Sequence, residues 1–356
     1  MDFYNNDSLT AIQAKEEAQR LAFAPIAFHA SKSLRDLGIL NCLSKFKSQG
    51  ASVEELTQQL SSIDSYGIQV LLDMGLSAGL VTWDEKRYKI TKLGHFVNHD
   101  EMTKVNMDFV SDICYQGMAR LTESILENRP AGLEALGDWP TVYEGLSKLT
   151  DKEKDSWFNF DHYYSDRSFP TILDTVFSGQ GKSICDIGAN TGKWTLKCCE
   201  FNPDITVTMV DLPQQLAIAE QNVAEKGFTS RVTTSPCNLL NIDAQLPKGR
   251  NIYWMSQFLD CFSQAEIVSI LTRVVDAMND DSDVYILELF PDRQEYESAS
   301  YTLNGTSLYF TAIANGNSRF YMSYDFLPLI EKSGLEIVSV KDNIGLGHSL
   351  IHCRKA

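Results

Sequence analysis

The chain has 356 residues, of which 44% are hydrophobic and 22% charged, a composition typical of a folded protein with room for about two domains. Its formal net charge of −16 disfavours nucleic acids, membrane surfaces and acidic macromolecules as partners, which leaves a small or neutral molecule as the default partner. The first twenty residues are polar and no apolar run reaches 18 residues, so we expect neither a transmembrane span nor a secretory signal.

The eight cysteines form no C-x-x-C pair and do not cluster with histidines. The sequence therefore predicts neither a zinc site nor a disulfide framework. We expect reduced thiols, a cytoplasmic location and no bound metal.

The first hundred residues show the order helix, helix, hairpin. Residues 22–43 are apolar with helical periodicity, Ser52 to Glu55 form a capping box that opens a second helix, and a third helix is predicted at 65–78 before a hairpin at 80–91. This order is typical of winged-helix domains, some of which bind DNA. The helix at 65–78 contains no Lys or Arg, so it lacks the phosphate contacts that supply much of the affinity for DNA. Residues 104–149 are predicted to be helical, with an apolar stripe that indicates core packing.

A ligand-binding turn is predicted in the middle of the chain. An apolar strand at 184–187 runs into the pattern D-x-G-x-N-x-G, a helix follows at 193–201, and a second strand ends on Asp211, 25 positions after Asp186. Glycines let the backbone turn tightly and approach a ligand, and an acid at the end of the second strand can accept both hydroxyls of a ribose. The spacing differs from the G-x-G-x-x-G fingerprint that holds a pyrophosphate, so we expect an adenosyl ligand without phosphates.

Alternating strands and helices continue to the end of the chain. The second strand, which ends on Asp211, is predicted at 206–211. Further strands are predicted at 232–235, 251–255, 284–289, 336–341 and 349–353. Helices are predicted between them at 213–226, 263–278 and 323–333. Strands separated by helices imply a parallel sheet, and the last two strands, joined through Gly345 and Gly347, imply an antiparallel hairpin at its end. Ligands are expected beyond the carboxyl ends of the strands.

These segments resemble the class I S-adenosylmethionine (SAM) dependent O-methyltransferase family, which includes plant caffeate and flavonoid enzymes and bacterial small-molecule enzymes. Residues 158–168 resemble its lead-in helix, 186–192 its D-x-G-G-G-x-G turn, 211–213 its D-L-P motif and 236–239 its G-D-x-F segment. The resemblance runs from about Ala22 to the end of the chain.

The resemblance implies an α/β fold, a Rossmann-like seven-stranded methyltransferase sheet behind an N-terminal helical, winged-helix dimerisation domain. It implies three parts: a dimerisation domain at 1–100, a helical connector covering the acceptor site at 101–165, and a SAM-binding domain at 166–356. A homodimer through the N-terminal domain is the implied assembly, and a helical cap within one monomer is the alternative.

The resemblance also implies which residues bind SAM and its product S-adenosylhomocysteine (SAH). Asn238 stands where the family has an acid near the adenine amino group, and its amide oxygen can accept the same hydrogen bond. The implied cofactor residues are Asp186, Gly188, Asn190, Gly192, Asp211, Leu212, Asn238, Leu239, Ser256 and Gln257.

The acceptor half of the site departs from the family. Relatives that methylate oxygen carry a catalytic histidine in a pattern like L-H-D-W, and this chain has Asp260 at that position, followed by Cys261 and Phe262. Glu288 matches the second family acid, and the third has no match. The candidate catalytic residues are therefore Asp260 and Glu288.

Three roles are open for Asp260: it orients the acceptor, it caps the following helix or sits solvated, or it acts as general base. A free aspartate titrates near 3.9 and a phenol near 10, so proton transfer would be uphill by about 6 units, on the order of 8 kcal/mol. A position just before a helix N-terminus would lower the pKa of Asp260 further and make it a poor base. His162, in the lead-in helix, is a further candidate base, with a packing role as the alternative.

The sequence thus predicts transfer of a methyl group from SAM to a hydroxyl oxygen of a small aromatic or polyketide-like metabolite. One alternative is an enzyme that uses SAM for decarboxylation, hydroxylation or cyclisation. A second alternative is a winged-helix regulator that senses a ligand.

Overall fold

The computed structural model describes residues 2–179 and 181–356. Its contacts divide the chain into two compact units, residues 2–111 and residues 112–356. The three-part division with limits at 100 and 165 rests on the anatomy of the resembled family and stays a prediction. In the part of the chain that the structure describes, no helix is long and apolar enough to cross a membrane.

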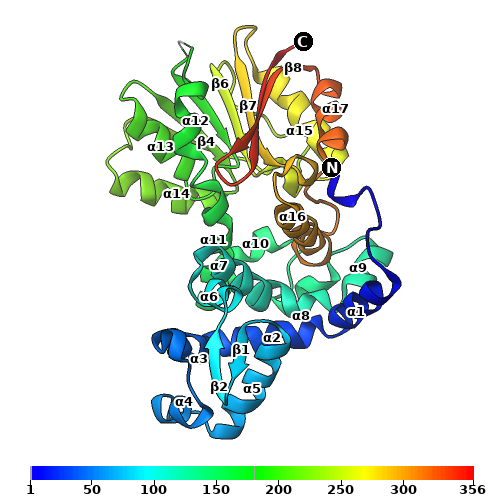
Figure 1. Cartoon of the computed structure of the whole chain (residues 1–356). Helices are drawn as coiled ribbons and strands as arrows, with labels where there is room; N and C mark the ends of the chain where they lie inside the picture. The colour runs from blue at the N-terminus through cyan, green and yellow to red at the C-terminus, as the bar shows by residue number, and fades with distance from the viewer. Residues whose placement is uncertain (1, 180) are drawn as a thin grey trace. The chain divides into compact units, whose positions relative to one another are not determined.

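The N-terminal unit is helical with one small hairpin (Figure 1). Its elements are α1 (Ala11–Ala22), α2 (Ala24–Asp36), α3 (Ile39–Lys45), α4 (Val53–Gln59), α5 (Ser65–Ser77), β1 (Val81–Asp84), β2 (Arg87–Ile90), α6 (Lys92–His99) and α7 (Glu101–Phe109). The predicted capping box is present, since the Ser52 hydroxyl accepts from the backbone of Glu55 and the Glu55 carboxylate accepts from the backbone of Ser52. The apolar stretch 22–43 is divided at Gly38, whose φ of 77° ends one helix and starts the next.

The core of this unit is built from α2 to α5 and the hairpin. Its fully buried members include Leu34, Leu43, Leu56, Ile68 and Leu72. Helix α1 is different, because none of its residues is buried.

The second unit begins with short helices. They are α8 (Tyr115–Met118), α9 (Leu121–Glu127), α10 (Val142–Gly145) and α11 (Asp151–Ser165), with α16 (Glu297–Tyr309) contributed from later in the chain. Gly117 and Gly132 let these segments pack closely, because a Cβ on Gly132 would lie 2.3 Å from the carbonyl oxygen of Gly117.

The rest of the second unit is a seven-stranded sheet. Its strands are β3 (Ser183–Ile187), β4 (Thr206–Asp211), β5 (Val232–Pro236), β6 (Ile252–Ser256), β7 (Asp283–Leu289), β8 (Leu335–Ile344) and β9 (His348–Lys355). Their order is β5-β4-β3-β6-β7-β9-β8, and β9 runs antiparallel to both of its neighbours while the other pairs are parallel. The predicted parallel sheet with a reversed hairpin at its end is confirmed.

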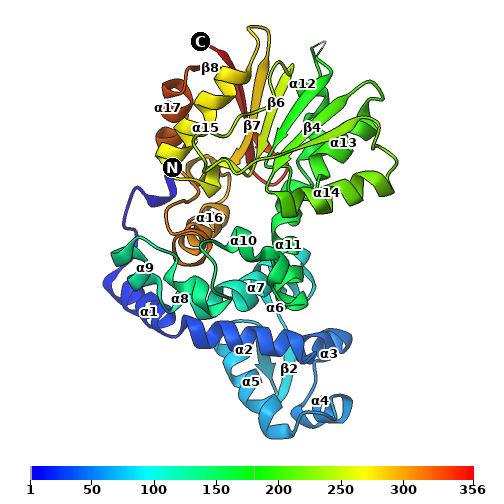
Figure 2. The same cartoon turned by 180° about the vertical axis from the view of Figure 1, so that it is seen from behind.

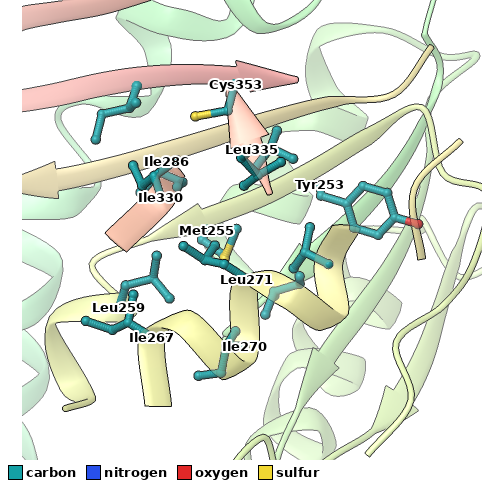
Figure 3. Close-up of a cluster of buried hydrophobic side chains, with 14 of the residues drawn as sticks. Tyr253, Met255, Leu259, Ile267, Ile270, Leu271, Ile286, Ile330, Leu335 and Cys353 are labelled. Carbon is teal, nitrogen blue, oxygen red and sulfur yellow. The ribbon is translucent and has the colours of Figure 1, made fainter. Parts of the chain in front are cut away.

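Helices cover both faces of this sheet (Figures 1 and 2). One face packs on α12 (Phe169–Val176), α13 (Lys193–Phe201) and α14 (Pro213–Glu225), and the other on α15 (Gln264–Ala277) and α17 (Ser323–Lys332). Side chains alternate between the faces along each strand, as the pleat requires: Ile252 and Trp254 belong to the first core, Tyr253 and Met255 to the second. Figure 3 shows part of the second core, to which Met255 and Ile286 of the sheet and Ile267 and Leu271 of α15 belong.

Candidate cofactor and acceptor site

The predicted turn follows β3 directly. Gly188 has φ 76°, Asn190 φ 49° and Gly192 φ 80°, so the chain enters the left-handed region three times within five residues before α13 begins. A Cβ on Gly188 would lie 2.3 Å from the ring of Phe258. Glycine is therefore required at 188 by the close approach as well as by the backbone angle.

Asp211 is held by two backbone groups at the end of β4. Its carboxylate accepts hydrogen bonds from the N–H of Asn190 (2.8 Å) and the N–H of Leu212 (2.7 Å), one on each oxygen. Partial burial raises its pKa from the ordinary value. Each oxygen keeps a further lone pair, so the fixed carboxylate can still accept from two hydroxyls of a ribose.

Asp186 lies deeper than Asp211. It is 2% exposed, and its Oδ2 accepts a 2.6 Å hydrogen bond from the hydroxyl of Thr195 in α13. Burial raises the pKa of Asp186 to about 7, and the neighbouring carboxylate of Asp211 adds to the effect. Asp186 thus braces α13 against the strand end below the turn.

The loop after β5 carries two further predicted residues. Asn238 is exposed, and its Oδ1 accepts from the N–H of Leu240 at 2.9 Å, which leaves one lone pair for another donor. Leu239 is buried, and Arg273 of α15 donates to its carbonyl oxygen at 2.6 Å. Arg273 therefore fixes the loop on which Asn238 stands.

The remaining predicted cofactor residues are Ser256, which ends β6, and Gln257, which follows it. The Oγ of Ser256 is buried and has no hydrogen-bond partner among the described residues. Gln257 has φ 46° and its Oε1 lies 2.6 Å from Nε2 of His348. These features suit an adenosyl cofactor: glycines clear its approach, Asp211 offers free lone pairs, and the Ser256 hydroxyl lacks a partner.

The acceptor candidate Asp260 is buried, which disagrees with the alternative of a solvated or helix-capping carboxylate. It lies in a 3-10 turn (Leu259–Cys261) and is 5% exposed, and the cap of α15 is formed by Ser263 instead. Loss of solvation raises its pKa, and the nearby Asp161 acts in the same direction. The expectation of a lowered pKa is wrong because burial outweighs the helix end.

Glu288 holds the turn that carries Asp260. Its Oε1 accepts from the backbone N–H of Phe258 (3.1 Å) and of Leu259 (2.9 Å), while Oε2 is buried with no partner among the described residues. Burial and the charge of Asp260 raise its pKa well above the ordinary value. Glu288 therefore positions the backbone before Asp260, and burial favours its neutral form.

The lead-in helix α11 brings an acid that the sequence reasoning missed. The Oδ2 of Asp161 accepts from the side-chain amide of Asn190 at 3.1 Å, which ties α11 to the cofactor turn. His162 lies beside Asp166 (3.7 Å) and Asp161 (4.0 Å) and stacks on Phe158. Its carboxylate neighbours raise the pKa of His162 against the effect of burial. Asp161 differs from its acidic neighbours in the sequence only by the contacts it makes in the folded structure.

Among residues 2–179 and 181–356, no three or more His, Cys, Asp or Glu side chains are grouped so that they could hold a metal ion.

Two family models match the chain. The model of the O-methyltransferase domain matches residues 169–335, which include the turn, the strand ends and the acceptor candidates, and that of the Dimerisation2-like domain matches residues 15–88. The chain belongs to the O-methyltransferase family. It is thus a SAM-dependent methyltransferase with a dimerisation domain at its N-terminal end.

Relatives of this methyltransferase act on different atoms. It is 20% identical to L-tyrosine C(3)-methyltransferase of Streptomyces lavendulae, over 88% of this chain and 85% of the relative. It is 29% identical to 3-hydroxy-5-methyl-1-naphthoate 3-O-methyltransferase of Streptomyces sahachiroi, over 68% of each chain.

Solved structures share the fold of this methyltransferase. The structure of mitomycin 7-O-methyltransferase has a TM-score of 0.74 at 17% identity, covering 96% of this chain and 98% of that one. An O-methyltransferase from neocarzinostatin biosynthesis, in complex with SAM and 2-hydroxy-5-methyl naphthoic acid, has a TM-score of 0.69 at 17% identity, covering 92% and 96%.

Proposed function

We propose that the protein transfers the methyl group of SAM to a hydroxyl oxygen of a small aromatic or polyketide-like metabolite, with Asp260 as the general base. The observation that carries this proposal is the burial of Asp260 on a turn next to the cofactor residues. When bound, SAM supplies an electrophilic methyl group. The side chains of the protein then need only to orient the acceptor and take its proton.

Burial makes an aspartate a usable base. Proton transfer from a phenol to an unperturbed aspartate is uphill by about 6 pKa units. Each unit by which burial raises the pKa of Asp260 lowers this cost by about 1.4 kcal/mol. Glu288 supports the base by fixing the backbone of Phe258 and Leu259. An acceptor that is already acidic, such as an electron-poor phenol or an enol, would reduce the remaining cost further.

Methylation of a ring carbon is the second candidate. A phenolate formed by loss of a proton to Asp260 can react at oxygen or at a ring carbon, and one relative over most of the chain is named as a tyrosine C(3)-methyltransferase. The same base would serve both reactions, because after attack by carbon the displaced ring proton moves to the phenolate oxygen and restores the aromatic phenol. The product therefore has to be identified by the position of its new methyl group.

The test uses the full-length protein with methyl-¹³C SAM and a panel of phenols, naphthols and amines, and NMR of the products. A ¹³C shift of a methoxy group supports the proposal, whereas an aryl-methyl or N-methyl shift would replace it with carbon or nitrogen methylation. Label that stays on the cofactor while the acceptor is converted would indicate decarboxylation, hydroxylation or cyclisation. Calorimetric titration with SAM and SAH is the prior check, because absence of binding would overturn the methyltransferase mechanism. A gel shift that shows specific DNA binding would favour the regulator.

We also propose that two copies pair through the N-terminal unit, in the cytoplasm. Helix α1 buries none of its residues and presents apolar side chains, with Ile12 73% and Leu21 75% exposed. Most of α1 lies within residues 15–88, which a Dimerisation2-like model matches, so contact with a second copy would cover these exposed apolar side chains. All eight cysteines are free thiols, which fits a reducing compartment.

If two copies pair through α1, a substitution that disrupts the contact should halve the mass of the particle in solution. We expect the wild type to sediment as a dimer and Leu21→Glu to sediment as a monomer at micromolar concentration, because a charge would be buried in the apolar contact. Glu16→Gln, on the same exposed helix, is the control and should remain dimeric. A wild-type protein that sediments as a monomer would support the helical-cap alternative.

A further inference from the structure

The last strand places a buried histidine at the cofactor edge of the sheet. His348 is the first residue of β9, and because β9 runs antiparallel to β7, it pairs with Leu289, the last residue of β7. The parallel strand β6 ends at the same edge, and Gln257 follows it directly. His348 is 0% exposed and is absent from the proton transfer proposed above.

Both ring nitrogens of His348 have a partner. Nε2 lies 2.6 Å from Oε1 of Gln257, and Nδ1 lies 2.9 Å from the hydroxyl of Ser168. An amide oxygen only accepts, so Nε2 carries the proton, and Nδ1 accepts from the Ser168 hydroxyl. Burial lowers the pKa of His348 to about 4, against the opposite effect of a hydrogen bond with the Ile344 backbone, so the ring is neutral at physiological pH.

The hairpin turn before His348 is packed against its surroundings. A Cβ on Gly345 would lie 2.3 Å from the Ser168 hydroxyl, and Gln294 donates to the carbonyl oxygen of Gly347 at 3.0 Å. Ser168 therefore contacts both the turn and the ring, so the imidazole has little freedom to rotate.

Gln257 needs such a support. Its φ of 46° lies in the left-handed region, which costs a residue other than glycine free energy and persists where the surroundings hold it. Its own N–H donates to the carbonyl oxygen of Leu287 at 2.9 Å, which fixes the backbone, and His348 fixes the side chain. With Oε1 engaged, the amide Nε2 remains as a donor with no partner among the residues that the structure describes.

We propose that His348 is a positioning residue of the cofactor site, which holds the side-chain amide of Gln257 so that its NH₂ group faces the cofactor as a hydrogen-bond donor. The inference rests on the proposed SAM site. A donor suits the acceptor atoms of the cofactor, such as its carboxylate, and would be unfavourable next to its ammonium group. Ser168 acts at one remove, because its hydroxyl can donate to Nδ1 and so stabilises the tautomer of His348 that donates to Gln257.

A double-mutant cycle on SAH affinity tests this role. His348→Phe and Gln257→Ala should each weaken SAH binding about tenfold in calorimetry, the effect of one lost hydrogen bond, and the double variant should be no weaker than Gln257→Ala alone. His352→Phe is the matched control: it makes the same substitution on the same strand, where the ring bonds Asp283 at 2.7 Å, and it should bind SAH as the wild type does.

Two outcomes would overturn the proposal while the proposed function stands: losses that add in the double variant, or a His348→Phe protein that binds SAH normally. If the wild type itself fails to bind SAH, the proposed function fails and the positioning role fails with it.

The tautomer of His348 can be measured in the wild-type protein, so this test does not depend on whether a variant folds. In ¹⁵N-labelled protein the His348 signals, assigned by their absence from His348→Asn, should show Nε2–H at pH 7. Ser168→Ala should increase the share of the other tautomer and weaken SAH binding by a smaller factor. A wild-type signal of Nδ1–H would overturn the assignment.

Discussion

At the scale of single residues, the proposed acceptor chemistry depends on a carboxylate that can hold and release a proton. Asp260 is removed from solvent, and its neighbours Glu288 and Asp161 are also acids, so each disfavours the charge of the others. A carboxyl group in such surroundings takes up protons far more readily than one in water. On the proposed mechanism, Asp260 therefore takes the role that the resemblance assigns to a histidine at this position.

Asp260→Asn preserves size and polarity and removes the base. We expect kcat to fall about 10²-fold to 10⁴-fold, because general-base catalysis contributes that much, with SAH affinity unchanged. Asp276→Asn, on the exposed face of α15, is the control and should retain full activity. Steady-state kinetics with the best acceptor provide the measurement, and a kcat within threefold of wild type would remove Asp260 from the mechanism.

Glu288 is expected to respond in a graded way. Glu288→Gln keeps an oxygen for the N–H groups of Phe258 and Leu259, so we expect a loss of kcat below about tenfold, whereas Glu288→Ala leaves both donors unpaired and should cost far more. Equal losses in kcat for the two variants would contradict a positioning role and favour a direct role in proton transfer.

The proposed cofactor residues could be predicted from the sequence more readily than the proposed acceptor residues. A short segment of sequence is enough to predict Gly188, Asn190, Gly192 and Asp211, because their residue types and spacing follow from a tight turn of the backbone. The burial of Asp260 and the contacts of His348 depend on segments far along the chain, so no local pattern contains them. Asp161 is likewise distinguished only by its bond to Asn190, 29 positions away.

At the scale of elements, the turn after β3 is the most constrained segment. Gly188 and Gly227 have nearly the same backbone angle, with φ of 76° and 78°, but a Cβ would meet the ring of Phe258 at 188 and open space at 227. Both alanine variants carry the strain of the left-handed region, about 1 kcal/mol, and only Gly188→Ala adds a steric clash.

We therefore expect Gly188→Ala to lower the free energy of unfolding by clearly more than Gly227→Ala, and to weaken SAH binding at least tenfold. Urea titration and calorimetry give the two quantities. The difference between the two alanine variants should shrink when both are made in a Phe258→Ala background. A difference that survives there would mean that the ring is not the obstacle.

The elements themselves were predictable where one physical pattern governs them. Strand β4 and helix α13 match their predicted limits, and the other strands of the sheet differ by no more than three residues at an end, because an apolar core on both faces leaves little freedom. Helix α16 was not predicted. Its sequence has no cap and mixes apolar and polar residues around the helix, so only packing against the rest of the second unit defines it.

At the scale of the whole molecule, the reversed strand determines which residues meet. Parallel strands bring their carboxyl ends to one edge, where Ser256, Asp211 and the turn at 188–192 gather. A seventh parallel strand would place its first residue at the opposite edge. Because β9 is antiparallel, the first residue of the strand, His348, joins the cofactor edge instead. The sequence predicted this reversal through Gly345 and Gly347 but gave no sign of its consequence for Gln257.

The free energy of unfolding of the molecule should depend on pH through the protonation of Asp186. Burial raises the pKa of Asp186 to about 7 in the folded state, from an ordinary value of 3.8 in the unfolded chain. Between these values the folded state holds a proton that the unfolded state has lost, so the contribution of this group is complete at low pH and disappears as pH rises through about 7. Asp186→Asn is neutral at every pH and still accepts from Thr195.

The free energy of unfolding of Asp186→Asn, relative to wild type, should therefore increase from pH 4 to pH 8 by up to about 4 kcal/mol, with most of the change below pH 7. Urea titrations of both proteins at intervals of one pH unit measure this difference directly, since groups common to both cancel. The exposed Asp276→Asn should give a curve parallel to wild type. Parallel curves for Asp186→Asn as well would mean that Asp186 is ionised in the folded protein. Thr195 and the turn would then stabilise the carboxylate form of Asp186 rather than its protonated form.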